Sequence, residues 1–336
     1  MCQDLYNETR RSYNKAVLGA LPKKKGKDKL LYFNFKSHNI LNPENAERMF
    51  KIIKKIGAEN VCLSEALVPN TIAATNGTLV ELQENATSTI VQPHDGDNIL
   101  EAFKEKKRND YRELPSQQKA TTWPWEARLW AMGYRYLIFA NPATCPWGAN
   151  WGNVMVMKSR PTQTEVRELG TAEGKRGFGT TYNESRNAIG AKLNDGTCLF
   201  TTHLENSDKA ARCAQAQELA TFVQDFAGEG AQKTLVGDIN SLHLPSYTKE
   251  QQQTLKKAWW PPLREDEELP HEATDILSKE AFKAAPPVNA GQTYESLYQK
   301  CVTHGWSTRF AHSAMYFTDV SAFDHQPLIL FGCRCR

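Results

Sequence analysis

Apolar runs of strand length recur along this chain, and they limit the folds it can adopt more than any other feature. The runs cover residues 30–35, 60–65, 134–140, 153–159, 188–193, 198–204, 233–239, 314–320 and 327–333. Apolar runs of this length, bounded by turn residues, are typical of buried strands. We therefore predict an α/β (α+β) protein with layered sheets, mostly β by strand count, around one compact core.

Two longer segments have the period of a helix. In residues 42–57, Asn42 is a candidate N-cap, Pro43 occupies the first helical position and Gly57 is a candidate stop. Residues 207–228 repeat the pattern with apolar residues on one face. Because the first helix lies between two predicted strands, we expect a βαβ-type unit at the start of the core.

The composition narrows the class of protein. With 40% hydrophobic residues among 336, the chain can bury a sizeable core, which argues against global disorder. Its net charge is only +3, so any affinity for nucleic acid has to come from local basic patches.

No apolar run reaches the length that a bilayer requires, and the first residues lack the apolar core of a secretory signal. We expect an intracellular location, nuclear or organellar, rather than secretion.

Three polar segments stand outside the predicted core. Residues 1–29 form a basic extension that reads either as a localisation signal or nucleic-acid arm, or as a solvated lead-in to the first strand. Residues 30–336 form the main domain, which two long segments interrupt at about 66–130 and 241–300. Polar segments of this length are predicted to be insertions, and we expect them to cover the core or to bind a protein partner.

Polar side chains stand where several predicted strands begin or end. They are Asn34, Glu65, His203, Asp238, Asn240, Asp324 and His325. Each has a structural explanation when taken alone, since Asn and Asp favour turns and a histidine can be satisfied in a core. Brought to one rim, they would surround a pocket with carboxylates, amides and imidazoles. Such a set suits a hard divalent cation together with acid–base chemistry on an oxyanion.

The order of these motifs resembles that of the endonuclease/exonuclease/phosphatase superfamily, which includes DNase I-like nucleases, tyrosyl-DNA phosphodiesterases, sphingomyelinases and inositol polyphosphate 5-phosphatases. The matching segments are FNF, VCLSE, GNVMVMKSR, TTHLEN, LVGDIN and FDHQPL, in that order between about residues 30 and 331. The resemblance implies a four-layered α/β/β/α sandwich of the DNase I type with two large insertions. It also implies hydrolysis of a phosphoester.

The resemblance assigns a role to each motif residue. Glu65, with Asn34 as its companion, would bind Mg²⁺, for which Mn²⁺ is a possible substitute. The catalytic group would comprise Asp238, which orients or deprotonates the attacking water, and Asn240, His203, His325 and Asp324, which position the phosphate or stabilise developing charge. Arg186 and Asn206 would contact a substrate phosphate, although Arg186 reads equally well as an ordinary surface arginine.

Three positions depart from the family pattern. Ser64 precedes the metal-binding glutamate where the family usually has Gln, and Phe323 precedes the Asp-His pair where Ser is usual. Ala311 occupies the place of the aspartate that orients the final histidine, and loss of that partner would leave the histidine less fixed. Asp319 or His312 are candidate replacements.

Three functions therefore stay open at the level of sequence. The first is a Mg²⁺-dependent phosphodiesterase or nuclease that uses in-line attack by water, with nucleic acid as the favoured partner. The second is a catalytically weakened family member that serves as a structural or binding subunit, which the loss of the aspartate at Ala311 favours. The third is a phosphoesterase that acts on lipid or inositol phosphates, similar to the sphingomyelinases.

Overall fold

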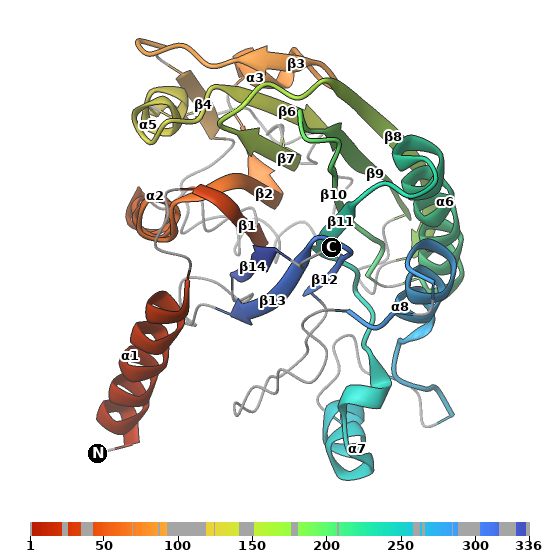
Figure 1. Cartoon of the computed structure of the whole chain (residues 1–336). Helices are drawn as coiled ribbons and strands as arrows, with labels where there is room; N and C mark the ends of the chain where they lie inside the picture. Colours follow the sequence, from red (N-terminus) through yellow and green to blue (C-terminus); the bar gives the residue numbers. More distant parts are fainter. Residues whose placement is uncertain are drawn as a thin grey trace.

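The structure is a computed structural model that describes residues 2–21, 26–34, 43–68, 70–86, 88–92, 119–123, 125–140, 151–175, 181–206, 208–257, 263, 266–283, 285–287, 303–315 and 327–333. Within these residues the strands form a seven-stranded sheet, a five-stranded sheet and a separate two-stranded ribbon. The ribbon consists of β4 (Ser88–Gln92) and β5 (Lys119–Trp123). Figure 1 shows the two larger sheets in the middle of the molecule, with helices on opposite sides of them.

The seven-stranded sheet contains the predicted βαβ unit. In spatial order its strands are β13 (Phe310–Met315), β14 (Leu328–Cys333), β1 (Gly26–Asn34), β2 (Ala58–Leu67), β7 (Trp151–Met157), β6 (Tyr136–Ala140) and β3 (Leu79–Glu81). β1 and β2 pair in parallel, and α2 (Pro43–Ile56) connects them. The helix stops where the sequence predicts, because Gly57 has a φ of 62° and its N–H bonds to Ile53 O at 2.9 Å.

The five-stranded sheet contains a second parallel pair. In spatial order its strands are β12 (Thr303–Ser307), β11 (Lys233–Asp238), β10 (Cys198–His203), β9 (Thr181–Lys192) and β8 (Gln163–Lys175). β10 and β11 run in parallel, and the predicted second helix, α6 (Lys209–Ala227), connects them. The Asp208 carboxylate caps this helix by accepting a hydrogen bond from Ala211 N at 3.0 Å, and Gly228 ends it.

Alternation along the strands divides the core into separate clusters. On β1, Leu31 and Phe33 pack with α2 and with α5 (Trp125–Ala131), whereas Leu30 and Tyr32 pack with side chains of the other sheet. On the second sheet, Phe200 packs against α6. Each large sheet therefore has one face toward the other sheet and one face toward helices, and the predicted mixed α/β class is confirmed.

The predicted polar extension contains a helix that the sequence did not indicate. α1 (Cys2–Ala20) occupies most of it, and its Val17, followed by Leu21, is buried in the cluster around α2. Figure 1 shows this end of α1 beside the body and the other end projecting away from it. An isolated polar helix of this kind is marginal in water, so the buried pair supplies the attachment that a solvated lead-in would lack.

The segments predicted as insertions contribute to the main body. β3 lies within 66–130, where it forms the edge of the seven-stranded sheet by pairing with β6. Within 241–300, α7 (Lys249–Lys257) is followed by α8 (Glu272–Ile276), which packs on α6 through Ala273. Five of the described strands, β3, β4, β5, β8 and β12, were not predicted, because none of them belongs to a continuous apolar run of strand length. β12 reads THGWS, yet its Trp306 is fully buried.

Candidate active site

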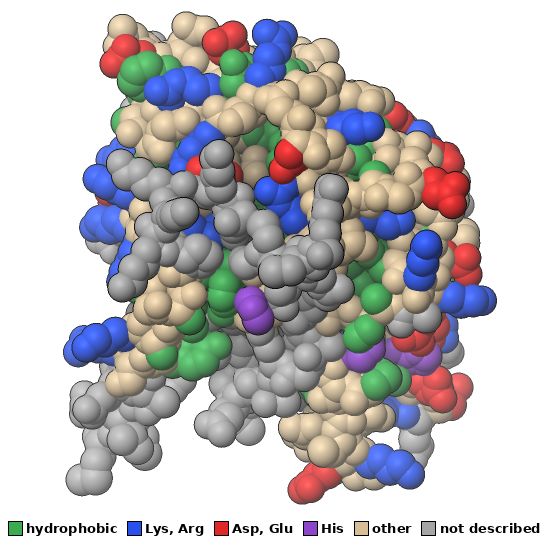
Figure 2. Space-filling model, viewed as in Figure 1, with side chains coloured by type: hydrophobic (Ala, Val, Ile, Leu, Met, Phe, Trp, Pro, Cys, Tyr) green, Lys and Arg blue, Asp and Glu red, His purple; other side chains and the backbone are tan. Residues whose placement is uncertain are grey.

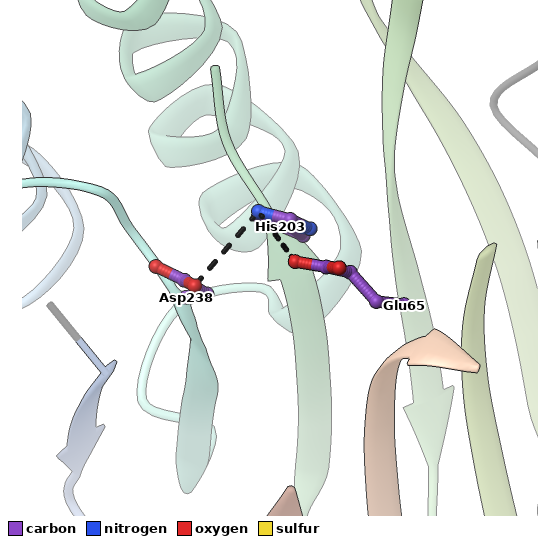
Figure 3. A group of neighbouring side chains, drawn as sticks. All are labelled: Glu65, His203 and Asp238. Carbon is purple, nitrogen blue, oxygen red and sulfur yellow. Dashed lines mark ion pairs between the residues drawn. The ribbon is translucent and has the colours of Figure 1, made fainter. Parts of the chain in front are cut away.

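Four predicted site residues meet where the parallel strands end. Asn34 ends β1 and Glu65 lies near the end of β2, while His203 and Asp238 end β10 and β11. Because parallel strands present their carboxyl ends at the same edge of a sheet, residues far apart in sequence converge there. Figure 3 shows the side chains of Glu65, His203 and Asp238 pointing toward one another. His203 and Asp238 come from one sheet and Glu65 comes from the other.

The polar atoms of this group lie within the reach of a single ion. One ligand atom each from Glu65, His203 and Asp238 lie within 4.8 Å of one another. His203 Nε2 is 3.8 Å from Glu65 Oε1 and 3.8 Å from Asp238 Oδ2. Asn34 Nδ2 joins the two carboxylates by donating to Glu65 Oε1 at 3.2 Å and to Asp238 Oδ2 at 2.8 Å. Asp238 and Asn34 are buried, whereas Glu65 is half-buried.

A bulge in β2 directs the glutamate toward this point. The pairing of β2 with β7 shifts register between Leu63 and Ala66, and Glu65 within that shift has a φ of 52°. A left-handed conformation is rare for a residue other than glycine, and strain of this kind is concentrated at functional sites. Bulges also redirect side chains at the edges of sheets. The bulge therefore orients Glu65 toward the site.

The turn after β11 has a similar local constraint. Asn240 has a φ of 51°; its N–H donates to Asp238 Oδ1 at 3.0 Å, and its Nδ2 donates to Leu204 O at 2.9 Å. Asn tolerates the left-handed region better than most residues do. The Asp-x-Asn spacing is thus explained by a turn in which both side chains hold the backbone.

A polar network beneath the site was not predicted. The Ser64 hydroxyl shares its proton between Asn153 Oδ1 at 2.8 Å and Thr202 O at 3.2 Å, so it links the two sheets. Asn153 Nδ2 in turn donates to Asn187 Oδ1 at 2.9 Å. Ser64 and Thr202 directly precede Glu65 and His203. The signal available in the sequence was an asparagine at the start of the apolar run NVMVMKS.

The predicted phosphate-binding residues have different surroundings. Arg186 is only 2% exposed and its Nη2 lies 3.5 Å from Glu205 Oε2, whereas Asn206 is exposed. Their contacts with a phosphate stay predictions. Asp324, His325 and Asp319 lie outside the described residues, so their predicted roles also stay open. Of the candidate replacements for the missing aspartate, His312 is exposed and its ring packs on Phe331.

Two buried groups near the site remain neutral at ordinary pH. Burial, and after it the negative charge of Asp238, raises the pKa of Tyr32 well above its usual value. Burial lowers the pKa of His304 to about 4. His304 Nε2 lies 2.8 Å from Ser241 O, and a contact with a carbonyl requires that this nitrogen carry the proton. His304 thus holds the residue that follows Asn240.

Comparison with known proteins gives matches at the level of structure. No family model and no curated protein matches the chain by sequence. The chain is similar to an endonuclease/exonuclease/phosphatase from Bacteroides vulgatus, with a TM-score of 0.51, 12% identity, and coverage of 90% of this chain and 98% of the other. It is also similar to the 3′ phosphatase NExo from Neisseria, bound to a product DNA hairpin, with a TM-score of 0.49, 12% identity, and coverage of 91% and 100%. An AP endonuclease from Archaeoglobus fulgidus matches with a TM-score of 0.48, 14% identity, and coverage of 90% and 98%.

The match to the Bacteroides vulgatus structure identifies the fold. The chain has the DNase I-like fold of the endonuclease/exonuclease/phosphatase superfamily, as the order of its motifs predicted. The convergence of Glu65 with Asp238, which that resemblance required, is also present. No helix among the described residues is long and apolar enough to cross a membrane.

Proposed function

We propose that the protein is a Mg²⁺-dependent phosphoesterase that cleaves a phosphodiester by in-line attack of water. The observation that carries the proposal is the convergence of Glu65, His203 and Asp238 at the ends of parallel strands, with their ligand atoms within 4.8 Å of one another. In-line hydrolysis of a phosphoester needs a carboxylate to handle the water proton and positive charge to neutralise the phosphate. The carboxylates of this group would supply the first function, and a cation that they hold would supply the second.

The donor atoms suit a hard divalent cation. Two carboxylates approach the same point and both accept from Asn34 Nδ2, so their mutual repulsion is only partly relieved by a neutral amide. Oxygen ligands of this kind are those that Mg²⁺ and Mn²⁺ prefer. In the proposal Glu65 and Asn34 hold the ion, which when bound supplies Lewis-acid neutralisation of the phosphate charge.

The chain's own residues divide the remaining tasks. Asp238 orients the water and accepts its proton, because its carboxylate is buried and held at Oδ1 by the Asn240 N–H. His203 Nε2, which lies between the two carboxylates, binds a phosphate oxygen. Asn240 keeps the turn in its left-handed conformation. The roles of Asp324 and His325, to stabilise negative charge on the leaving group, rest on the sequence resemblance alone.

We further propose a nucleic-acid phosphodiester as the substrate, with Asn206 contacting a flanking phosphate. Figure 2 shows charges of both signs on the face it presents, with Lys and Arg side chains gathered over α2. The exposed lysines there are Lys51, Lys54 and Lys55. A polyanion would therefore be held by local basic groups rather than by a strongly positive surface. Lipid and inositol phosphates are the alternative substrates.

The test is a hydrolysis panel. Single- and double-stranded DNA, RNA, phosphotyrosyl-DNA, sphingomyelin and inositol phosphates are incubated with the protein in Mg²⁺ and again with EDTA. We expect cleavage of a nucleic acid that EDTA and Asp238→Asn abolish, while the matched control Asp225→Asn, on the exposed face of α6, retains full activity. Product that persists with Asp238→Asn would contradict the assigned roles.

The weakened or structural alternative has a separate test. Calorimetric titration with Mn²⁺ compares the wild-type protein with Glu65→Ala. If the site is functional, the wild-type protein binds Mn²⁺ and Glu65→Ala does not. If the site has decayed, the two proteins give the same titration. The absence of the usual aspartate at Ala311 is the feature that favours this alternative.

A further inference from the structure

The backbone of Leu204, which directly follows β10, is hydrogen-bonded to β11 and to the turn after β11. Leu204 N donates to Asp238 O at 2.9 Å, and Leu204 O accepts from Asn240 Nδ2 at 2.9 Å. The backbone of a single residue therefore contacts both the end of β11 and the turn that follows it. Any shift of Leu204 would move His203 on one side and Asn240 on the other.

The next residue, Glu205, is fixed by its backbone from α6. Its N–H donates to Gln215 Oε1 at 2.9 Å, and its carbonyl accepts from Arg212 Nη1 at 3.1 Å. Gln215 and Arg212 are three positions apart on the helix, so they project from the same face. Both are 2% exposed. The helix thus satisfies both backbone groups of Glu205 in a place that water does not reach.

The side chain of Glu205 is fixed by an ion pair. Its carboxylate Oε2 lies 3.5 Å from Arg186 Nη2, and the two side chains are 4% and 2% exposed. The interaction of two buried charges is screened little by solvent. Removal of one partner leaves the other as an uncompensated buried charge, which is strongly unfavourable. The carboxylate therefore has one favoured position, between α6 and β9.

We propose, on the basis of the hydrolytic function proposed above, that Glu205 is a positioning residue for His203 and Asn240. Its backbone contacts with α6 and its carboxylate contact with Arg186 hold Leu204 in place, and Leu204 holds the two strand ends in register. In this arrangement the main task of Arg186 is to neutralise Glu205, and a substrate phosphate is not required to explain its burial.

Glu205→Gln tests the proposal because it removes the charge and keeps the shape. We expect kcat to fall about 10-fold to 100-fold, as it does when residues that orient a reactive group are lost. KM should change by less than about twofold, because no substrate contact is removed. Amide hydrogen exchange should accelerate in the peptides that contain residues 203–206 and 238–241. The matched control Glu229→Gln, at an exposed position in the turn after α6, should change none of these quantities.

A second set of variants keeps the test decisive if Glu205→Gln folds poorly. Gln215→Ala removes the acceptor of the Glu205 N–H, together with a longer contact from Gln215 Nε2 to Gly170 O at 3.5 Å, and should accelerate exchange in the same two peptides. Arg186→Met should lower the melting temperature, and the double variant Arg186→Met/Glu205→Gln should recover part of that loss, because it leaves neither charge unpaired.

Several outcomes would overturn the proposal. Unchanged exchange and kcat in Glu205→Gln would show that the ion pair does not position the site. A raised KM with unchanged kcat would mean that Glu205 or Arg186 contacts substrate instead. Additive losses in the double variant would mean that the two side chains do not act as a pair. If the wild-type protein hydrolyses nothing in the panel, the proposed function fails, whereas the exchange measurements still decide the role of Glu205.

Discussion

His203 and Asp238 face each other at the ends of two adjacent parallel strands: they are partners in the β10–β11 register, and His203 Nε2 lies 3.8 Å from Asp238 Oδ2. The pair one position earlier is Thr202 and Gly237. A Cβ atom at Gly237 would lie 2.5 Å from Thr202 O, a backbone atom that cannot move without its strand. The close approach of the two site strands thus depends on this glycine.

Gly237→Ala should disturb the site by pushing apart the two strands that end in His203 and Asp238. We expect the variant to lose about 1–3 kcal/mol of unfolding free energy through overpacking, and to lose activity because the strand ends separate. Urea denaturation and hydrolysis assays measure the two effects. The control is Gly19→Ala in α1, where a Cβ meets nothing within 4 Å, and it should be neutral or stabilising by up to about 1 kcal/mol. Equal effects of the two substitutions would contradict the packing argument.

A divalent ion should stabilise the folded protein. An ion that binds only the native state adds about 2.7 kcal/mol at a concentration of one hundred times its Kd, so the melting temperature should rise in Mg²⁺ or Mn²⁺ and return to its starting value in EDTA. Glu65→Gln should remove most of this shift, since it removes the charged ligand of the proposed site. Glu229→Gln removes an exposed carboxylate elsewhere and should keep the shift. A shift of the same size in Glu65→Gln would place the ion at another site.

The sequence was sufficient to predict much of the fold for a physical reason. Buried strands such as β1, β10 and β11 are continuous apolar runs, and a helix stop such as Gly57 has a strong local preference. β12 was missed because its burial depends on Trp306 among polar and glycine residues. α1 was missed because its attachment depends on tertiary burial of a few side chains near its end, which no local pattern in a polar segment reveals.

The site was predictable to the extent that polar residues end apolar strands. Asn34, Glu65, His203 and Asp238 each interrupt or end such a run, and parallel topology brings them together. The support of the site was not predictable in the same way. The hydrogen bond from Ser64 to Thr202 joins the two sheets. The contacts that hold Glu205 join the end of β10 to α6 and β9. Both sets of contacts are made between segments far apart in the sequence.

The Ser64 link has a measurable consequence. Ser64→Ala removes a buried hydroxyl whose partners are Asn153 Oδ1 and Thr202 O, and both acceptors stay buried. We expect a loss of about 1–3 kcal/mol of unfolding free energy. The matched control is Thr221→Ala, which removes an exposed hydroxyl on α6 that bonds Gln217 O, and it should change stability by less than about 0.5 kcal/mol. If Ser64→Ala and Thr221→Ala have equal unfolding free energies, the link between the sheets contributes nothing to stability.

The buried histidine behind the Asp238 turn predicts a dependence of stability on pH. Burial lowers the pKa of His304 from an ordinary value near 6.5 to about 4 in the folded state. Between these values the unfolded chain binds a proton that the folded chain excludes, so the unfolding free energy falls as pH falls from about 6.5 toward 4. Below the folded pKa both states are protonated and this contribution is constant. Its total is of order 3 kcal/mol.

The measurement is urea denaturation of the wild-type protein and His304→Gln at several pH values through this window. Glutamine can still donate to Ser241 O but does not titrate, so the variant should lose less stability on acidification than the wild type does. Carboxylates titrate in both proteins, and the difference between the two curves therefore isolates the histidine. His312→Gln, at an exposed position, should follow the wild-type curve. Parallel curves for wild type and His304→Gln would mean that His304 is not buried as a neutral group.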